Sequence, residues 1–240
     1  MTKAIWNEAL DDDGPGGLAS IITEFELITR RDYGQFCALS RAVEAIGERW
    51  GLLIIRDLLV SPKTRAQLRD GLPRIPADVL GARLREFERD GIARSRELPG
   101  GEIRYELTEY GQELEQITLA LGRWGARLLN LPRPGEIITV DALITAMRAA
   151  FDIAAAAGVR ASYEISLGDI VLHAIVDDGT LAVGSGPMPD ADLLLSTGGE
   201  LKALMFGELD PREGIATGAL RITGDPELLV RFTELFHIDA

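Results

Sequence analysis

The sequence lacks several features that would place a protein in a narrow class. Its 240 residues include one cysteine, Cys37, so an internal disulfide is impossible and a reducing compartment is favoured. No apolar run approaches the roughly 18 residues of a membrane-spanning helix, and the N-terminus has no basic segment followed by an apolar one. We therefore expect a cytoplasmic protein with no membrane partner.

Residues for catalysis are also scarce. The chain has two histidines: His173 alternates with apolar neighbours, and His237 lies three residues from the end. Neither has a serine, cysteine or carboxylate at a motif spacing. No metal-ligand cluster or phosphate-binding loop occurs, because the glycine-rich stretch 14–17 does not join a strand to a helix. We expect structural histidines, no metal, no cofactor and no enzymatic activity.

Charge of one sign dominates the chain but not its middle third. The net charge is −13, of which residues 1–30 carry −4 and residues 131–240 carry −10, whereas residues 31–130 carry +1. The basic residues of that middle part cluster between Lys63 and Arg104. Such clusters are either solvated helix faces or a surface for nucleic-acid phosphates.

The order of elements in this middle part is that of a winged helix-turn-helix. Helical spacing and punctuation predict helices over 37–47, 49–60, 64–72 and 77–91, the third capped by Thr64. Alternation around a Pro-Gly-Gly tip predicts a hairpin over 93–108. The hairpin would be the wing.

The helix over 77–91 is the candidate reader of bases. Leu80, Leu84 and Phe87 form its apolar stripe, and the opposite side is free to enter a groove. Only Asp78 offers direct readout near its start, so DNA shape and arginines would supply part of the specificity. The expected DNA-contacting residues are Lys63, Thr64, Arg65, Ala77, Asp78, Ala82, Arg83, Arg85, Arg89, Arg96 and Arg104.

A last helix in this part, over 109–130, carries an apolar seam spaced 3, 4, 3, 4. Its residues are Leu114, Ile117, Leu121, Trp124 and Leu128. The spacing favours pairing with a second copy in a homodimer. Packing on the first two helices of its own chain is the alternative.

The segments YGQFCALSRAVEAIGERWGLLIIRDLL, LRDGLPRIPADVLGARLREFERDGIARSREL, YELTEYGQEL and LGRWG together resemble the HxlR family of bacterial transcriptional regulators over about residues 33–130. The resemblance implies a homodimeric winged helix-turn-helix that binds double-stranded operator DNA. The chain departs from the family pattern at Pro76, Ala77 and Asp78, so the operator sequence does not follow. The family also implies a possible sensor role for Cys37, for which a packed, inert thiol is the alternative.

The second half has a different pattern after a Pro-rich linker. It predicts a helix over 140–158, strands over 161–167, 170–176, 180–186 and 191–196, a helix opened by a capping box at 197–200, and a final helix after Asp225.

This half, and the run LMFGELDPREGIATGALRITGD in particular, resembles the sterol carrier protein-like domain over about residues 139–238. The resemblance implies an antiparallel sheet, helices and an apolar cavity for a small hydrophobic ligand. The candidate lining residues, each of which could be plain core instead, are Phe151, Tyr163, Met205, Phe206, Ile215, Phe232 and Phe236.

The expected fold is therefore α+β in two domains. Residues 1–30 form an extension, either an extra helix or disordered. Residues 31–130 form the DNA-binding and dimerisation domain, 131–138 the linker, and 139–240 the ligand-binding domain. The expected function is a transcriptional regulator modulated by a small hydrophobic effector. The alternative is a redox- or electrophile-sensing regulator acting through Cys37, with a structural or dimerising C-terminal domain.

Overall fold

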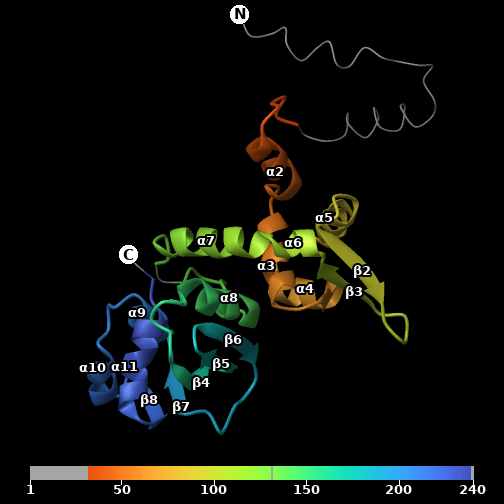
Figure 1. The fold of residues 1–240 in the computed structure, drawn as a ribbon. Helices are drawn as coiled ribbons and strands as arrows, with labels where there is room; N and C mark the ends of the chain where they lie inside the picture. Colours follow the sequence, from red (N-terminus) through yellow and green to blue (C-terminus); the bar gives the residue numbers. More distant parts are fainter. Residues whose placement is uncertain (1–31, 131, 239–240) are drawn as a thin grey trace, which may run out of the picture. The chain divides into compact units, whose positions relative to one another are not determined.

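A computed structural model describes residues 32–130 and 132–238 (Figure 1). The chain divides into two compact units, one ending at Arg49 and one beginning at Trp50. The helix expected within residues 1–30 lies outside the described residues. In the first unit, α2 (Ala38–Ile46) begins after Cys37 and ends at Gly47, as predicted.

The second unit begins with the remainder of the winged helix-turn-helix. Its elements are α3 (Gly51–Val60), β1 (Lys63–Thr64), α4 (Arg65–Gly71), α5 (Ala77–Arg89), β2 (Ala93–Glu97) and β3 (Ile103–Leu107). The strands form an antiparallel sheet in the order β1-β3-β2. The predicted helices and the hairpin are confirmed, whereas β1 was not predicted because two residues show no alternation.

Burial of one face of each helix holds this part together. Leu80, Leu84 and Phe87 of α5 are buried, as are Ile54 and Ile55 of α3. Each such side chain contributes about 1.5–3 kcal/mol by leaving water. The apolar stripe predicted on α5 is therefore its packing face, and the opposite face is left to solvent.

The helix predicted over 109–130 is interrupted. It consists of α6 (Glu109–Gln112) and α7 (Leu114–Ala126), separated by a turn at Glu113. Gly111 fixes α6 against the wing, because a Cβ at this position would overlap the carbonyl oxygen of Ile92. No side chain other than hydrogen fits there.

The C-terminal half is a mixed sheet with helices. Its elements are α8 (Val140–Ala150), β4 (Arg160–Leu167), β5 (Ile170–Asp177), β6 (Thr180–Ser185), β7 (Leu193–Thr197), α9 (Glu200–Met205), α10 (Pro211–Thr217), β8 (Arg221–Gly224) and α11 (Pro226–Leu235). The strand order is β6-β5-β4-β7-β8. The α+β class is confirmed, but the sheet is not purely antiparallel, since β7 lies parallel to β4. The crossover after β6 returns the chain to the far side of β4.

Three local predictions for this half were wrong in detail. The helix α8 stops at Ala150 instead of Gly158, because Phe151 is extended and forms a bridge with Phe236. The expected capping box is absent: Gly199 is the N-cap of α9, and Thr197 belongs to β7. The helix α10 and the strand β8 were not predicted, although Asp210 caps α10 through its side chain.

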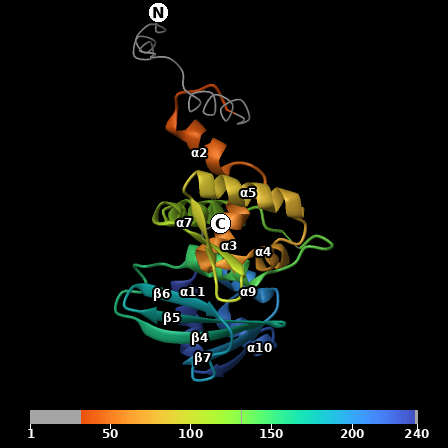
Figure 2. The same ribbon diagram turned by 90° about the vertical axis from the view of Figure 1, so that its right-hand side faces the viewer.

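The core of this half lies on one face of the sheet. Alternate residues of β4, including Tyr163 and Ile165, join one buried cluster with side chains of α8, α9 and α11. The ribbon of α11 lies behind the sheet in Figure 2. Rings make up its centre: the centroid of Phe232 lies 5.4 Å from that of Tyr163 and 4.8 Å from that of Phe236. Burial raises the pKa of Tyr163 to about 12.

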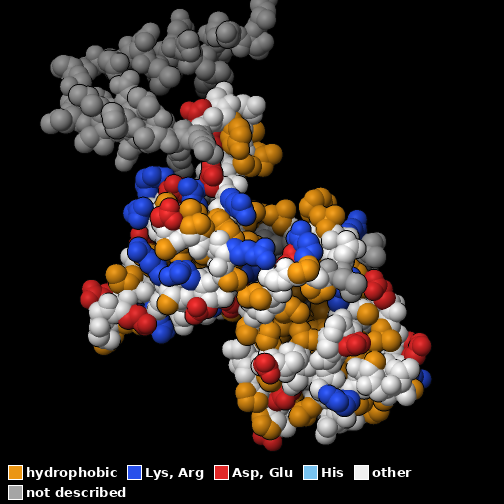
Figure 3. All heavy atoms as spheres, turned by 180° about the vertical axis from the view of Figure 1, so that it is seen from behind, with side chains coloured by type: hydrophobic (Ala, Val, Ile, Leu, Met, Phe, Trp, Pro, Cys, Tyr) orange, Lys and Arg blue, Asp and Glu red, His pale blue; other side chains and the backbone are white. Residues whose placement is uncertain are grey.

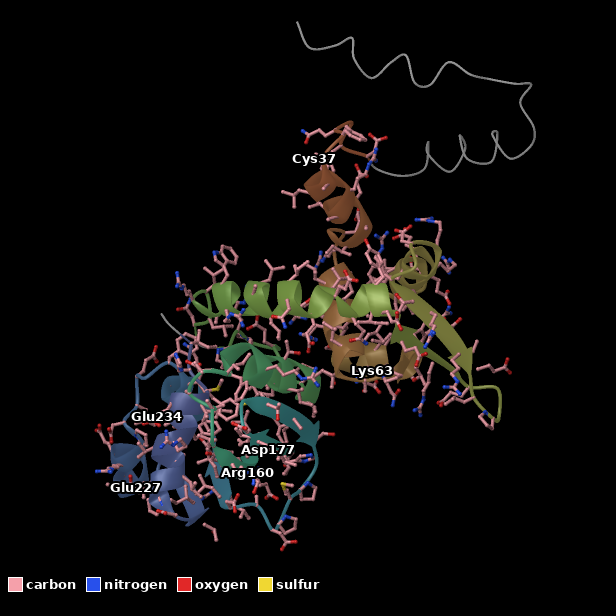
Figure 4. The ribbon with its side chains drawn as sticks, in the orientation of Figure 1. Cys37, Lys63, Arg160, Asp177, Glu227 and Glu234 are labelled. Carbon is pink, nitrogen blue, oxygen red and sulfur yellow. The ribbon has the colours of Figure 1, made fainter. Side chains whose placement is uncertain are left out.

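The helix α8 joins the two halves of the second unit, since it packs against both α3 and α7. Polar contacts fix its position. The Nζ of Lys63 lies 3.0 Å from Oδ1 of Asp141 at the start of α8 (Figure 4). At the other end, Arg148 donates to the carbonyl of Leu59 at 3.1 Å.

A buried carboxylate lies beneath this junction. The side chain of Asp57 is 0% exposed, and its Oδ1 is 2.6 Å from Nη2 of Arg56. Its Oδ2 has no hydrogen-bond partner in the part of the chain that the structure describes. Burial raises the pKa of Asp57 to about 6; Arg56 opposes that rise and Asp141 adds to it. A charge at Asp57 is therefore unfavourable in the folded chain.

Replacing Asp57 with asparagine should remove a pH-dependent contribution to stability. Its folded-state pKa lies about two units above the unfolded value of about 4, so the contribution is fully present below about pH 4 and lost as the pH rises through about 6. Two units correspond to roughly 3 kcal/mol. Relative to Asp57→Asn, the wild-type free energy of unfolding in urea should fall by about that amount between about pH 4 and about pH 7.

The exposed Asp190 provides the matched control. Asp190→Asn should leave the pH profile of the wild type unchanged. Parallel profiles for the wild type and Asp57→Asn would show that Asp57 ionises normally in the folded chain.

Candidate nucleic-acid interface

The free face of α5 combines small and charged residues. Ala77, Asp78, Arg85 and Arg89 are exposed, and Ala82 is half-buried. Pro76 is the N-cap and makes no side-chain capping bond. Small residues at the start of the helix permit close approach of a partner, whereas the arginines lie on its later turns.

The arginines of this face differ in how far they are neutralised. Arg83 forms an ion pair with Glu86 at 2.7 Å, and Arg89 approaches Asp90 at 3.4 Å. Within the described residues, Arg85 has no ion-pair or hydrogen-bond partner. It is the most available positive charge on α5.

The wing places two arginines side by side. Arg96 of β2 is directly opposite Arg104 of β3 in the antiparallel register. Arg104 is 3.4 Å from Glu102, whereas Arg96 has no ion-pair partner within the described residues. Like charges directly opposite each other destabilise a hairpin, and a bound anion would relieve that repulsion.

Three other predicted contact residues have structural roles. Lys63 pairs with Asp141 and is mostly buried. Thr64 caps α4 in a capping box with Gln67. Arg65 lies over the ring of Tyr105 and donates from Nε to its hydroxyl at 3.0 Å. Only Arg65 of these three remains exposed.

Sequence reasoning left Arg69 out of the predicted contacts. It lies exposed on α4 with no ion-pair or hydrogen-bond partner within the described residues. Its position directly after the buried Leu68 could have marked it as solvent-facing. Seen from behind, Lys and Arg side chains gather over the lobe that carries α5 and the wing (Figure 3).

The predicted apolar seam on α7 faces solvent. Ile117, Leu121, Trp124 and Leu128 are 50%, 45%, 66% and 68% exposed, and Leu114 is half-buried. The residues that α7 buries in its own chain are Thr118, Leu119 and Ala126. The seam therefore does not pack on the described part of its own chain.

The predicted cavity residues pack together in the C-terminal core. Tyr163, Met205, Phe232 and Phe236 are buried members of one cluster. Phe151, Phe206 and Ile215 are partly buried against it. These apolar side chains fill the space by packing on one another. The buried hydroxyl of Tyr163 has no hydrogen-bond partner within the described residues.

Cys37 is exposed at the start of α2 (Figure 4). The backbone N–H groups of Ser40, then of Leu39, at the first turn lower the pKa of its thiol. An exposed thiol with a lowered pKa is the form that reacts with oxidants and electrophiles. Within the described residues, the thiol of Cys37 is therefore exposed and not packed, as the alternative would require.

Among residues 32–130 and 132–238, no helix is long and apolar enough to cross a membrane. The same residues contain no group of three or more His, Cys, Asp and Glu side chains arranged to hold a metal ion. The Nδ1 of His173 lies 3.0 Å from the carbonyl oxygen of Gly186, a contact between strand and turn.

Comparisons with known proteins match two separate segments of the chain to two families. Residues 45–132 match the model of the HxlR-like helix-turn-helix family, and residues 141–237 match that of the SCP-2 sterol transfer family.

Several relatives described as HTH-type transcriptional regulators each match about two fifths of this chain. The uncharacterized HTH-type transcriptional regulator YtcD of Bacillus subtilis (strain 168) is 33% identical over 96 residues, 39% of this chain and 75% of YtcD. The uncharacterized HTH-type transcriptional regulator Rv3095 of Mycobacterium tuberculosis (strain ATCC 25618 / H37Rv) is 35% identical over 99 residues, 40% of this chain and 61% of Rv3095. The structure of the redox regulator HypR in its oxidized form, 28% identical, covers 40% of this chain and 100% of HypR with a TM-score of 0.38.

The family match and the identity to YtcD agree with the winged helix-turn-helix and the mixed α+β half described above. The chain belongs to the HxlR-like helix-turn-helix family of transcriptional regulators, and it carries an SCP-2 sterol transfer domain behind its DNA-binding domain.

Proposed function

We propose that this chain binds operator DNA as a homodimer and that a small molecule bound by its C-terminal half modulates the binding. The observation that carries the proposal is the free face of a winged helix-turn-helix on which Arg85 and Arg96 have no neutralising partner among residues 32–130 and 132–238. Guanidinium groups in that position contact backbone phosphates and gain affinity by counterion release.

The base-reading part of α5 is weaker than its phosphate-binding part. Of Ala77, Asp78 and Ala82, only Asp78 can form hydrogen bonds, and it accepts them, as from a cytosine amino group. Sequence preference therefore comes partly from the shape of the DNA, which the two arginines on the wing read through the backbone.

Dimerisation follows from the exposed seam on α7. Three exposed apolar side chains in one row on α7, with Leu128 in the turn directly after it, form a surface that pairs with a second copy in a coiled-coil manner. A twofold arrangement would present two α5 helices to successive major grooves on one side of the duplex.

The C-terminal half is placed to influence the dimer. Its helix α8 packs on α7, the helix that carries the seam, and Arg123 of α7 donates to the carbonyl of Ala149 at 3.0 Å. A ligand that binds one arrangement of α7 and α8 more tightly than another shifts the spacing of the two α5 helices. The proposed domains remain those set out from the sequence, with residues 131–138 as the linker.

A second candidate function rests on Cys37. Its thiol is exposed and its pKa is lowered, which fits a regulator that responds to oxidants or electrophiles. In that case the C-terminal half would serve the structure or the dimer only. Both functions place the protein beside DNA in the cytoplasm.

Replacing Arg85 with alanine should weaken binding to operator and random DNA by a similar factor, because a phosphate contact carries no sequence information. The slope of log affinity against log salt should fall by about 1. Fluorescence anisotropy with labelled duplexes at several salt concentrations measures both quantities. Arg83→Ala, which removes an arginine already paired with Glu86, should have a smaller effect. A loss confined to the operator would contradict the phosphate role.

Replacing Leu121 with glutamate should convert the dimer into a monomer and abolish operator binding, because a charge would be buried in the middle of the seam. Light scattering after size-exclusion chromatography measures the mass. Ile175→Glu, an exposed apolar position on β5, is the control and should stay dimeric. A Leu121→Glu dimer of unchanged stability would mean that α7 is not the dimer contact.

Diamide should release operator DNA from the wild-type chain but not from Cys37→Ser, if Cys37 is the sensor. Because Cys37 is the only cysteine of the 240 residues, no second thiol in the chain can react with diamide. Mobility shifts with and without diamide measure the release. Equal release from both chains, or from neither, rejects the second candidate function.

A further inference from the structure

The winged helix-turn-helix and the C-terminal half line an open pocket that sequence reasoning did not indicate. Its volume is about 530 Å³, which lies within the range of small-molecule sites. Residues from three segments line it: the end of α7, the end of α8 with the turn after it, and the segment that follows α11. The helix α7 lies across α8 in this region (Figure 1).

The base of the pocket is well fixed. Phe151 bridges to Phe236 across it, with the backbone N–H of Asp152 donating to Leu235 at 2.8 Å and that of His237 donating to Ala150 at 3.0 Å. The ring centroid of Phe151 is 5.7 Å from that of Phe236, a member of the C-terminal core. A molecule in the pocket therefore contacts a rigid base.

The residues that line the pocket include two arginines and two large, exposed apolar side chains. Arg123 donates one N–H to Ala149, which leaves other donors of its guanidinium. Arg127 has no ion-pair or hydrogen-bond partner within the described residues. Trp124 is two-thirds exposed and Ile153 is 69% exposed, although both are large and apolar. Such side chains at a pocket rim mark a binding surface.

Among the described residues that line the pocket, Asp152 is the only carboxylate, and the lining also holds Arg123 and Arg127. Oδ1 of Asp152 accepts hydrogen bonds from the backbone N–H groups of Ala154 at 2.7 Å and Ala155 at 3.1 Å. His237 contributes its imidazole ring to the lining. Two arginines and one carboxylate give the described lining a net positive charge, although residues 131–240 carry a net charge of −10.

We infer that this pocket binds an amphipathic monoanion, a carboxylate with an apolar body, and that it is the site of the effector in the proposed function. Arg127, assisted by Arg123, binds the carboxylate, and the apolar body lies along Trp124, Phe151 and Ile153. The site differs from the buried aromatic cluster around Tyr163, which is filled by its own side chains. Because Trp124 belongs to both the pocket and the seam, an occupant contacts the dimer surface directly.

Calorimetry of the full chain with decanoate tests the inference, and 1-decanol serves as the uncharged probe. Decanoate should bind at least about tenfold more tightly than 1-decanol, and Arg127→Gln should weaken decanoate binding by about tenfold, as expected for loss of a charged hydrogen bond. Ile153→Asp should weaken both probes. Arg212→Gln, at an exposed arginine paired with Glu227 outside the pocket, should change neither.

Equal affinity for the two probes, or unchanged decanoate affinity in both Arg127→Gln and Ile153→Asp, overturns the inference. Decanoate binding that disappears as the chain dimerises also overturns it, since a second copy would then fill the pocket. A mobility shift in the same samples separates the two claims. Arg127-dependent decanoate binding without DNA binding rejects the proposed function and leaves the pocket as a binding site. DNA binding without decanoate binding overturns the inference about the pocket and leaves the proposed DNA binding.

Discussion

The packing of α8 against α3 and α7 is the contact on which the rest of the structure depends. It joins the winged helix-turn-helix from α3 onward to the C-terminal half within one compact unit. Its polar contacts, Lys63 with Asp141 and Arg148 with the carbonyl of Leu59, are set at opposite ends of α8. A hydrogen-bonded charge pair removed from water fixes geometry more than it adds stability, and the unpartnered Oδ2 of Asp57 beside it is itself unfavourable.

Because α8 packs against α7, the three sides of α7 have different surroundings. One side of the helix is buried in its own chain, a second lies on α8 and the pocket, and a third carries the exposed seam. A change at the pocket therefore needs no long path to reach the exposed seam, because Trp124 lies in both. The acidity of residues 131–240 is consistent with a half that faces away from DNA, where repulsion by phosphates is least.

Much of the fold could be predicted from the sequence because local rules agree with tertiary packing there. The apolar stripe of α5, the capping residue Thr64 and the Pro-Gly-Gly tip each specify one local structure. Prediction failed where tertiary contacts overrode local preference: the alanine-rich stretch after Phe151 favours helix, but the bridge to Phe236 ends α8 early.

The candidate site shows the same division. Exposure of Arg85 and of the α7 seam follows from helical periodicity, so both could be predicted. The pairing of Lys63 with Asp141, 78 residues apart, and the meeting of Arg127 with Ile153 and His237 have no signal in a single sequence, because they depend on how α8 docks. A sequence pattern predicts which face of a helix is apolar. Which of these faces contact one another depends on the tertiary packing of the helices.

Sedimentation velocity of the full chain, mixed with a DNA duplex from upstream of its own gene, tests the central claim most directly. The account predicts a complex of two chains per duplex that dissociates as salt is raised. A complex of one chain per duplex, or no complex at low salt, would contradict it.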